Sequence, residues 1–230
     1  MAATPPEGDP LAAALAALGA PPEGAARLRR YAALLRRWNR AFNLVARGDE
    51  ADLERRHLLD SLVAVPFLRG PRVLDLGSGA GLPGIPLAVA RPGLAFVLAD
   101  RRARRTRFLE EAVAALGLDD VRVVTADVRR WPEGRGAFGT VVARAVAPLP
   151  ELAALARPLL APGGRLVAIK GPRVEEELAG LSGWRVARPR PPALGQPATT
   201  TLVVLEPGTG TPPDGGRGGA DAPQTGLPGV

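Results

Sequence analysis

The chain has 230 residues, enough to bury one sizeable core with room for a small accessory segment. It contains no cysteine and a single histidine, His57, which excludes disulfides, a thiolate zinc site and a cysteine nucleophile and argues against a histidine-based metal site. A formal net charge of +7 and a pI of about 11.2 favour a polyanionic partner such as nucleic acid, although GC-rich coding alone would also enrich arginine.

The first part of the chain is expected to be helical. Residues 1–10 contain Pro, Gly and acids but no basic region, which predicts a flexible N-terminus rather than a secretory signal. A short helix is expected over 11–18. Over 27–45, large apolar residues recur at alternating spacings of three and four, which predicts a long amphipathic helix. The stripe consists of Leu28, Tyr31, Leu35, Trp38, Phe42 and Val45.

A third helix is expected at about 51–67. On this helix His57, Asp60 and Ser61 share one side, because they stand three and four residues apart. No apolar run in the sequence approaches the roughly 18 residues that span a bilayer. We therefore expect a cytoplasmic monomer with no membrane partner and no metal.

From Arg72 onward, short apolar segments alternate with helical patterns, which predicts a mostly parallel sheet covered on both faces. The expected strands are 72–76, 94–99, 121–125, 139–143, 165–170, 184–189 and 200–206, with helices at about 83–91, 102–116, 148–160 and 173–180. No helical pattern separates the last two strands, which predicts an antiparallel edge. The expected segments are a flexible N-terminus (1–10), a helical segment packed on the core (11–67), the core (68–206) and a disordered Gly- and Pro-rich tail (207–230).

The first predicted strand leads directly into a glycine-rich turn. Gly77, Gly79 and Gly81 occupy alternate positions, which lets a ligand approach the main chain and the N–H groups that open the next helix. The second strand ends at Asp100, whose carboxylate could accept hydrogen bonds from the hydroxyls of a ribose. The pattern predicts a nucleotide-bearing cofactor.

Two readings of this turn imply different cofactors. Residues 79–84 match the dinucleotide fingerprint G-x-G-x-x-G, but that reading leaves Gly77 without a role. A reading that begins at Asp75 puts Gly77 at the strand end and adds an acid, which would repel a pyrophosphate but suits an ammonium or sulfonium group. S-adenosylmethionine carries both cations. The turn therefore favours S-adenosylmethionine, with a nicotinamide or flavin cofactor as the alternative.

Six short motifs together resemble the bacterial 16S rRNA guanine-N7 methyltransferase family, also called the glucose-inhibited division protein B family. They are, in chain order, Trp38–Leu44, Arg56–Ser61, Asp75–Ala88, Arg107–Leu109, Ala143–Ala145 and Lys170–Gly171. The resemblance runs from about Leu28 to Glu206. Its most specific part is Gly77–Pro86.

The resemblance implies a class I S-adenosylmethionine-dependent methyltransferase fold, Rossmann-like, with a mostly parallel seven-stranded sheet and an N-terminal helical extension. It implies methylation of N7 of one guanine, position 527, in 16S rRNA, supplied as free rRNA or as a small-subunit ribonucleoprotein. Matched by motif, Gly77 and Leu82 contact the cofactor, Val128 and Arg129 lie at the adenine, and Arg144 faces the cofactor or the base. Relatives usually have an acid where Arg129 stands, so a main-chain role is expected there, and Arg101 replaces a small polar residue.

Guanine N7 carries an in-plane lone pair, so its methylation needs alignment rather than a general base. Arg144 and Lys170 end or follow strands where ligands bind in such sheets, and they are candidates for orienting the guanine O6 or a phosphate. Lys170 is the one lysine beside 29 arginines. An ion pair with a neighbouring acid is the alternative for both, and His57 is a third candidate.

Other functions compatible with the turn are methylation of another RNA, a small molecule or a protein. An oxidoreductase that uses a dinucleotide and a catalytically silent RNA-binding module are further alternatives. The run from Arg101 to Arg107 opens a helix, where cations oppose the helix dipole. It is either an RNA phosphate contact or a solvated helix face.

Overall fold

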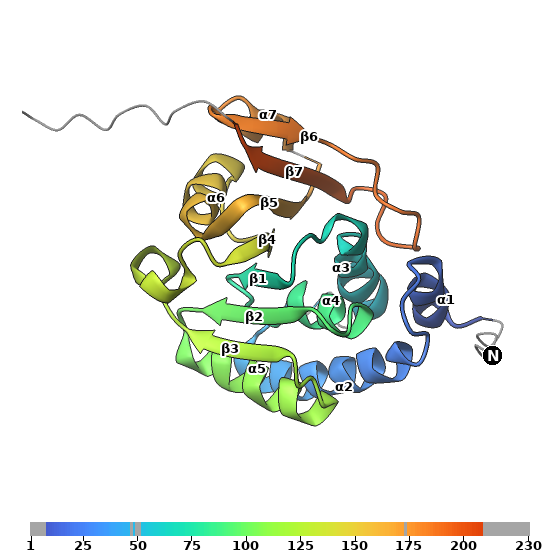
Figure 1. Cartoon of the computed structure of the whole chain (residues 1–230). Coiled ribbons are helices and arrows are strands. Elements are labelled where there is room, and N and C mark those ends of the chain that lie inside the picture. Colours follow the sequence, from blue (N-terminus) through green and yellow to red (C-terminus); the bar gives the residue numbers. More distant parts are fainter. Residues whose placement is uncertain (1–7, 47, 49–51, 173, 209–230) are drawn as a thin grey trace, which may run out of the picture.

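A seven-stranded sheet forms the centre of the molecule in the computed structural model, which describes residues 8–46, 48, 52–172 and 174–208 (Figure 1). The strand order is β3-β2-β1-β4-β5-β7-β6. The strands are β1 (Arg72–Leu76), β2 (Ala95–Asp100), β3 (Val121–Thr125), β4 (Phe138–Arg144), β5 (Leu160–Lys170), β6 (Trp184–Ala187) and β7 (Thr201–Pro207).

Strands β1 to β5 pair in parallel, whereas β7 pairs antiparallel with both β5 and β6. The predicted parallel sheet with an antiparallel edge is therefore confirmed. The strand boundaries differ from the prediction by at most two residues except at β5, which begins at Leu160, five residues before its predicted start, because Leu160 pairs with Phe138 ahead of a register shift. The order reverses between β1 and β4, and in such sheets ligands bind at the carboxyl ends of the strands at this reversal.

Helices cover both faces of the sheet (Figure 1). Apolar side chains of β1 alternate between the two hydrophobic clusters, with Val73 in one and Leu74 and Leu76 in the other. The first cluster contains side chains of α1 (Pro10–Ala17), α2 (Gly24–Phe42), α4 (Gly84–Ala90) and α5 (Ala103–Leu116). The second contains side chains of α6 (Leu149–Ala156) and α7 (Val174–Leu178).

The N-terminal helices are part of the same core as the sheet. Leu28, Tyr31 and Leu35 of the predicted stripe are fully buried, and the Tyr31 hydroxyl donates to the carbonyl of Ala80 in the glycine turn. Helix α1 begins at Pro10 because the Asp9 carboxylate caps its first turn. The predicted flexible start over 1–10 is thus wrong at its last residues, while 1–7 lie outside the described part.

The third predicted helix exists but is irregular. It comprises a π-helical segment η2 (Glu54–Leu59), a short α3 (Asp60–Leu62) and a 3-10 turn η3 (Val65–Phe67). The three segments bury successive parts of the predicted helix, and the sequence pattern did not predict the change of helical form between them. Single π turns inside helices are frequent at functional sites.

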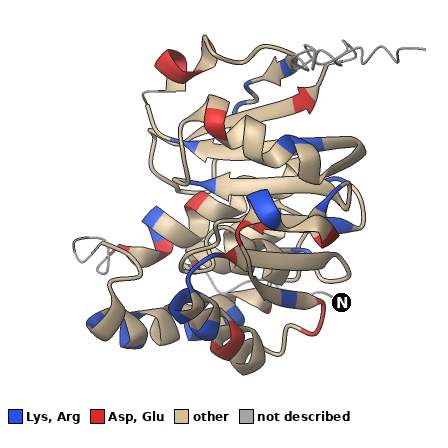
Figure 2. Ribbon diagram, turned by 90° about the vertical axis from the view of Figure 1, so that its left-hand side faces the viewer, with Lys and Arg blue, Asp and Glu red and all other residues tan. Residues whose placement is uncertain are grey.

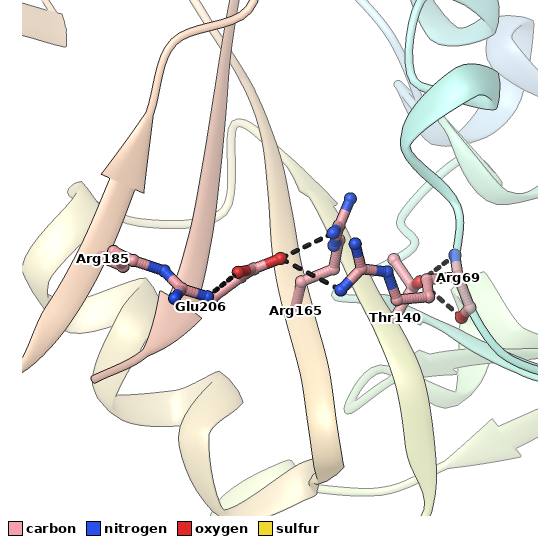
Figure 3. Close-up of polar contacts among 5 residues, drawn as sticks. All are labelled: Arg69, Thr140, Arg165, Arg185 and Glu206. Atoms are coloured by element: carbon pink, nitrogen blue, oxygen red, sulfur yellow. Dashed lines mark hydrogen bonds and ion pairs between the residues drawn. The ribbon is translucent and has the colours of Figure 1, made fainter. Parts of the chain in front are cut away.

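At the amino ends of the parallel strands, one carboxylate ties four segments together (Figure 3). Glu206 of β7 pairs with Arg165 of β5 at 2.6 Å, with Arg69 before β1 at 3.2 Å, and with Arg185 of β6. The Arg69 main chain is held in turn by Thr140, which donates to the Arg69 carbonyl (2.8 Å) and accepts from its N–H (2.7 Å). This Glu206 network therefore connects the antiparallel edge of the sheet to the entry of β1.

The end of the sheet reaches slightly into the segment predicted as tail. Pro207 still pairs with Trp184, and the Gly208 N–H donates to the Gly183 carbonyl at 2.9 Å. The disordered tail predicted for 207–230 is therefore wrong for its first two residues, and 209–230 lie outside the described part. Among the described residues, no helix is long and apolar enough to cross a membrane.

Candidate active site at the carboxyl ends of the strands

A first cavity, of about 330 Å³, opens at the carboxyl ends of β1, β2 and β3 and beside the segment after β4. Its volume is within the range of small-molecule sites. Residues that line it include Gly77, Asp100, Arg105, Asp127, Val128 and Arg129. Four of these, Gly77, Asp100, Val128 and Arg129, are predicted cofactor-binding residues.

The glycine turn keeps side chains out of this cavity. Gly77 follows β1 directly and has a φ of +70°, and a Cβ there would lie 3.0 Å from Cγ2 of Val146, another lining residue. Gly81 has a φ of +86° and a Cβ there would lie 2.5 Å from Cδ1 of Ile85. Gly77 thus leaves room at the cavity wall, whereas Gly81 allows the turn to pack on the helix below.

Asp100 joins the end of β2 to the glycine turn. Its Oδ2 accepts from the Gly79 N–H at 3.0 Å and from Arg105 Nη1 at 3.3 Å, and its Oδ1 accepts from the Arg102 N–H at 2.9 Å. The carboxylate lines the first cavity, and Oδ1, which accepts one hydrogen bond, has a second lone pair for a ligand. The predicted contact of Asp100 with a ribose stays a prediction.

Asp75 and Leu82 lie away from the cavity surface. Asp75 is 1% exposed, and its Oδ2 accepts from the Gly84 N–H at 2.9 Å beneath the turn. Burial raises the pKa of Asp75 to about 6. Leu82 is 5% exposed, and Gly79 and Gly81 are likewise absent from the residues that line the first cavity. Their predicted cofactor contacts stay predictions; in the structure these residues shape and support the turn.

Asp127 is a lining residue that the sequence analysis missed. The Arg129 guanidinium donates to both of its carboxylate oxygens, from Nε at 2.9 Å and from Nη2 at 2.8 Å. These hydrogen bonds lower the pKa of Asp127 to about 2. The available signal was an acid two residues after β3, at the same edge of the sheet as Asp100.

A second cavity, of about 500 Å³, lies beside the first. It brings together all three predicted catalytic residues, His57, Arg144 and Lys170, with Asp60 and Thr200. Ala145 lines both cavities and has a φ of +53°, a left-handed conformation that is uncommon for a residue with a side chain. Such backbone strain tends to cluster at functional sites.

Both predicted cations of the second cavity are ion-paired. Arg144 Nη1 lies 3.2 Å from Asp60 Oδ2 and also donates to the carbonyl of Arg56 at 3.4 Å. Lys170 Nζ lies 2.6 Å from Glu177 Oε2 and donates to the carbonyl of Ala147 at 3.0 Å. The two readings of Arg144 and Lys170, ion pair and site residue, are therefore compatible.

Helices α2 and α5, at the bottom of Figure 1, carry many of the chain's basic residues, and Figure 2 marks basic positions in blue. Arg104 of α5 lies over the ring of Phe42, and Arg105 pairs with Asp100. Within the described ranges no group of three or more His, Asp and Glu side chains could hold a metal ion.

The strand order and a glycine turn opening into a cavity at the sheet's reversal define a class I methyltransferase fold. Solved structures share it. A predicted O-methyltransferase from Agrobacterium tumefaciens aligns with a TM-score of 0.52 and 24% identity, over 65% of this chain and 81% of that one. A tRNA (m1A58) methyltransferase from Aquifex aeolicus aligns with a TM-score of 0.51 and 16% identity, over 66% and 69%.

Sequence comparison identifies the family. The rRNA small subunit methyltransferase G family matches residues 25–183, and this chain belongs to it. The ribosomal RNA small subunit methyltransferase G of Ralstonia nicotianae is 43% identical over 210 residues, which cover 86% of this chain and 94% of that protein. The protein of the same name from Methylococcus capsulatus is 46% identical over 182 residues, 79% and 88% of the two chains. The resemblance found in the sequence is confirmed.

Proposed function

We propose that this chain transfers the methyl group of S-adenosylmethionine to N7 of a guanine in 16S rRNA, with the cofactor in the first cavity and the guanine in the second. Membership of the methyltransferase family supports the reaction. The observation that carries the assignment of the cavities is their junction at Ala145, since a methyl donor and its acceptor must meet in one place.

The residues of the first cavity fit the cofactor. Gly77 leaves space at its wall, Asp100 Oδ1 offers an acceptor for a ribose hydroxyl, and Val128 and Arg129 line the part of the cavity that would receive an adenine. When bound, S-adenosylmethionine supplies a sulfonium methyl group that a nucleophile can displace. The predicted interaction of Asp75 with its cationic groups would act from beneath the turn.

The second cavity offers donors that suit guanine. N7 and O6 form an acceptor pair that an arginine or lysine recognises well, and Arg144 and Lys170 both line this cavity. N7 already carries a lone pair, so the chain's contribution is to orient the base and exclude water. A guanine can enter such a cavity only from a single strand or after leaving its stack.

Affinity for RNA is expected to come from many arginines rather than from the two cavities. The chain has 29 arginines, and neutralising phosphates with them makes binding fall steeply with salt. A substrate of 16S rRNA or an assembling small subunit supports the proposal that the enzyme acts in the cytoplasm.

The test combines binding and product analysis. Calorimetry should show binding of S-adenosylmethionine and none of NAD. Small-subunit rRNA incubated with labelled cofactor should carry one new methyl group, located by mass spectrometry of fragments at N7 of one guanine. Cofactor binding without methylation of RNA would indicate another substrate or a silent binding module, and binding of NAD alone would indicate an oxidoreductase.

A further inference from the structure

We propose that Asp60, held by Thr200, is a positioning residue that sets the direction of the Arg144 guanidinium in the second cavity. The proposal rests on the proposed function, in which this cavity receives the guanine. Asp60 opens α3, Arg144 ends β4 and Thr200 precedes β7. Three distant parts of the chain therefore meet at one carboxylate.

Both oxygens of the Asp60 carboxylate are occupied by different partners. Oδ2 lies 3.2 Å from Arg144 Nη1, and Oδ1 accepts from the Thr200 hydroxyl. The Thr200 main chain is itself anchored, since its N–H donates to the Pro197 carbonyl at 3.1 Å. A carboxylate held at both oxygens cannot rotate freely, so it presents Oδ2 to Arg144 in one direction.

Asp60 differs from the other acid of this cavity. Glu177 pairs with Lys170 and accepts a hydrogen bond from the Leu149 N–H at the start of α6, so its contacts do not include Arg144. Among the described residues, Asp60 supplies the carboxylate that pairs with Arg144. The side chains of Arg144 and Asp60 are 14% and 12% exposed, so water screens their interaction less than that of a surface pair.

The π turn before Asp60 adds a second contact to the same nitrogen. The carbonyl of Arg56, which lies in η2 just before Asp60 in the chain, accepts a hydrogen bond from Arg144 Nη1 at 3.4 Å. The described hydrogen bonds of the Arg144 guanidinium all start from Nη1. Nη2 and Nε, on the remaining edges of the planar group, can then serve an acceptor in the cavity.

Removing this support should affect alignment more than binding. Without the Asp60 charge, the Arg144 side chain can turn to other rotamers or toward solvent. A misplacement of about 1 Å at a reacting group can cost roughly a hundredfold in rate. The cofactor contacts lie in the first cavity, of which neither Asp60 nor Thr200 is a lining residue.

A double-mutant cycle in the full-length protein tests the proposal. Asp60→Asn should lower the single-turnover rate at saturating rRNA by about tenfold to a hundredfold, the loss expected for one charge-assisted hydrogen bond. The dissociation constants for S-adenosylmethionine and rRNA should stay within about twofold. In an Arg144→Ala background, Asp60→Asn should have almost no further effect, because the residue it positions is gone.

Two further variants keep the test interpretable if Asp60→Asn does not fold. Thr200→Val removes the hydroxyl at similar volume and should lower the rate by a smaller factor, whereas Thr200→Ser should retain it. Glu206→Gln is the matched control, since it also removes a carboxylate from arginines but lies at the amino ends of the parallel strands, away from the second cavity. It should leave the single-turnover rate unchanged.

The outcomes separate this proposal from the proposed function. Multiplied losses in the double variant would overturn the positioning role while the unaltered protein still methylates rRNA. Equal rates for Thr200→Val and Thr200→Ser would overturn it as well, whether or not Asp60→Asn folds. Absence of methylation by the unaltered protein would overturn the proposed function and this proposal with it.

Discussion

Arginine–carboxylate pairs occur at both ends of the parallel strands, and they differ in number, burial and surroundings. At the carboxyl ends, Arg144 pairs with Asp60, and both side chains are nearly buried beside a cavity. At the amino ends, Glu206 pairs with three arginines, two of which are more than half exposed, and it lines neither of the cavities described above (Figure 3).

The same pair of charges therefore has two uses in one molecule. A half-buried carboxylate shared among several arginines ties strands together, and its ion pairs with the exposed Arg69 and Arg185 contribute little individually. A single pair beside a cavity gives one guanidinium a defined direction. The comparison teaches that the number of arginines sharing the carboxylate, and a position beside a cavity, separate a structural arginine from a candidate site arginine, because Arg144 and Arg165 are equally buried.

The largest effect on methylation should follow from removing Arg144, the arginine at the carboxyl ends of the parallel strands. Arg144→Ala should lower single-turnover methylation by on the order of a hundredfold, the scale of a lost orienting contact. Affinity for rRNA should change little, since it is distributed over many phosphate contacts. Filter binding across a salt series and single-turnover assays measure the two quantities. Near-normal turnover in the folded variant would make Arg144 a structural residue like those around Glu206.

A smaller loss is expected for the carboxylate at the first cavity. Asp100→Ala should weaken S-adenosylmethionine binding by roughly 1.5–3 kcal/mol, the range for a hydrogen bond to a charged group. Calorimetry gives the dissociation constant, and rRNA affinity should remain unaltered. Asp119→Ala is the control, because Asp119 is an exposed acid at the amino end of β3. Equal cofactor affinity in both variants would contradict a cofactor contact by Asp100.

Asp75 extends the comparison to a buried carboxylate that no arginine pairs with among the described residues. Burial raises its pKa to about 6, above the ordinary value of 3.8, so the folded protein favours the protonated form. As pH rises from about 4 to about 6, the unfolded chain releases the Asp75 proton while the folded protein keeps it, so the free energy of unfolding falls, and this loss is complete above about pH 6. Asp75→Asn should avoid that loss.

The melting temperature of Asp75→Asn relative to the unaltered protein should therefore rise by a few degrees between pH 4 and pH 7. The difference between the two proteins is the quantity to follow, because other carboxylates change the stability of both alike. A difference that is constant over this pH range would contradict the raised pKa.

The smallest effect is expected from changing Glu206, at the amino ends of the parallel strands. Glu206→Gln should lower the free energy of unfolding by about 1 kcal/mol, because Arg165 loses its partner while the exposed arginines return to water. Arginine hydrogen bonds hold the pKa of Glu206 below its usual range, so this stability should fade as pH falls through the acid range. Denaturant melts at neutral and low pH measure it. A lower methylation rate in a fully folded Glu206→Gln protein would show that the Glu206 network contributes to catalysis and not only to stability.

The sequence by itself determined the strand positions, the antiparallel edge, the glycine turn and the family, because each is written in local periodicity or in a contiguous motif. Gly77 and Asp100 were found in this way, and both line the first cavity. Asp127 could have been found by the same rule, as an acid after a strand.

Only the tertiary structure decided which side chains meet. Asp75 faces the helices beneath the turn, since strand alternation directs it to the side of Val73 rather than to the cavity. Asp60 lies 84 residues from Arg144 and 140 from Thr200 along the chain. Periodicity reports whether a residue is buried and on which side of its own element. Contacts between distant loops depend on strand order and on where each loop crosses the sheet edge, and no local pattern contains that information.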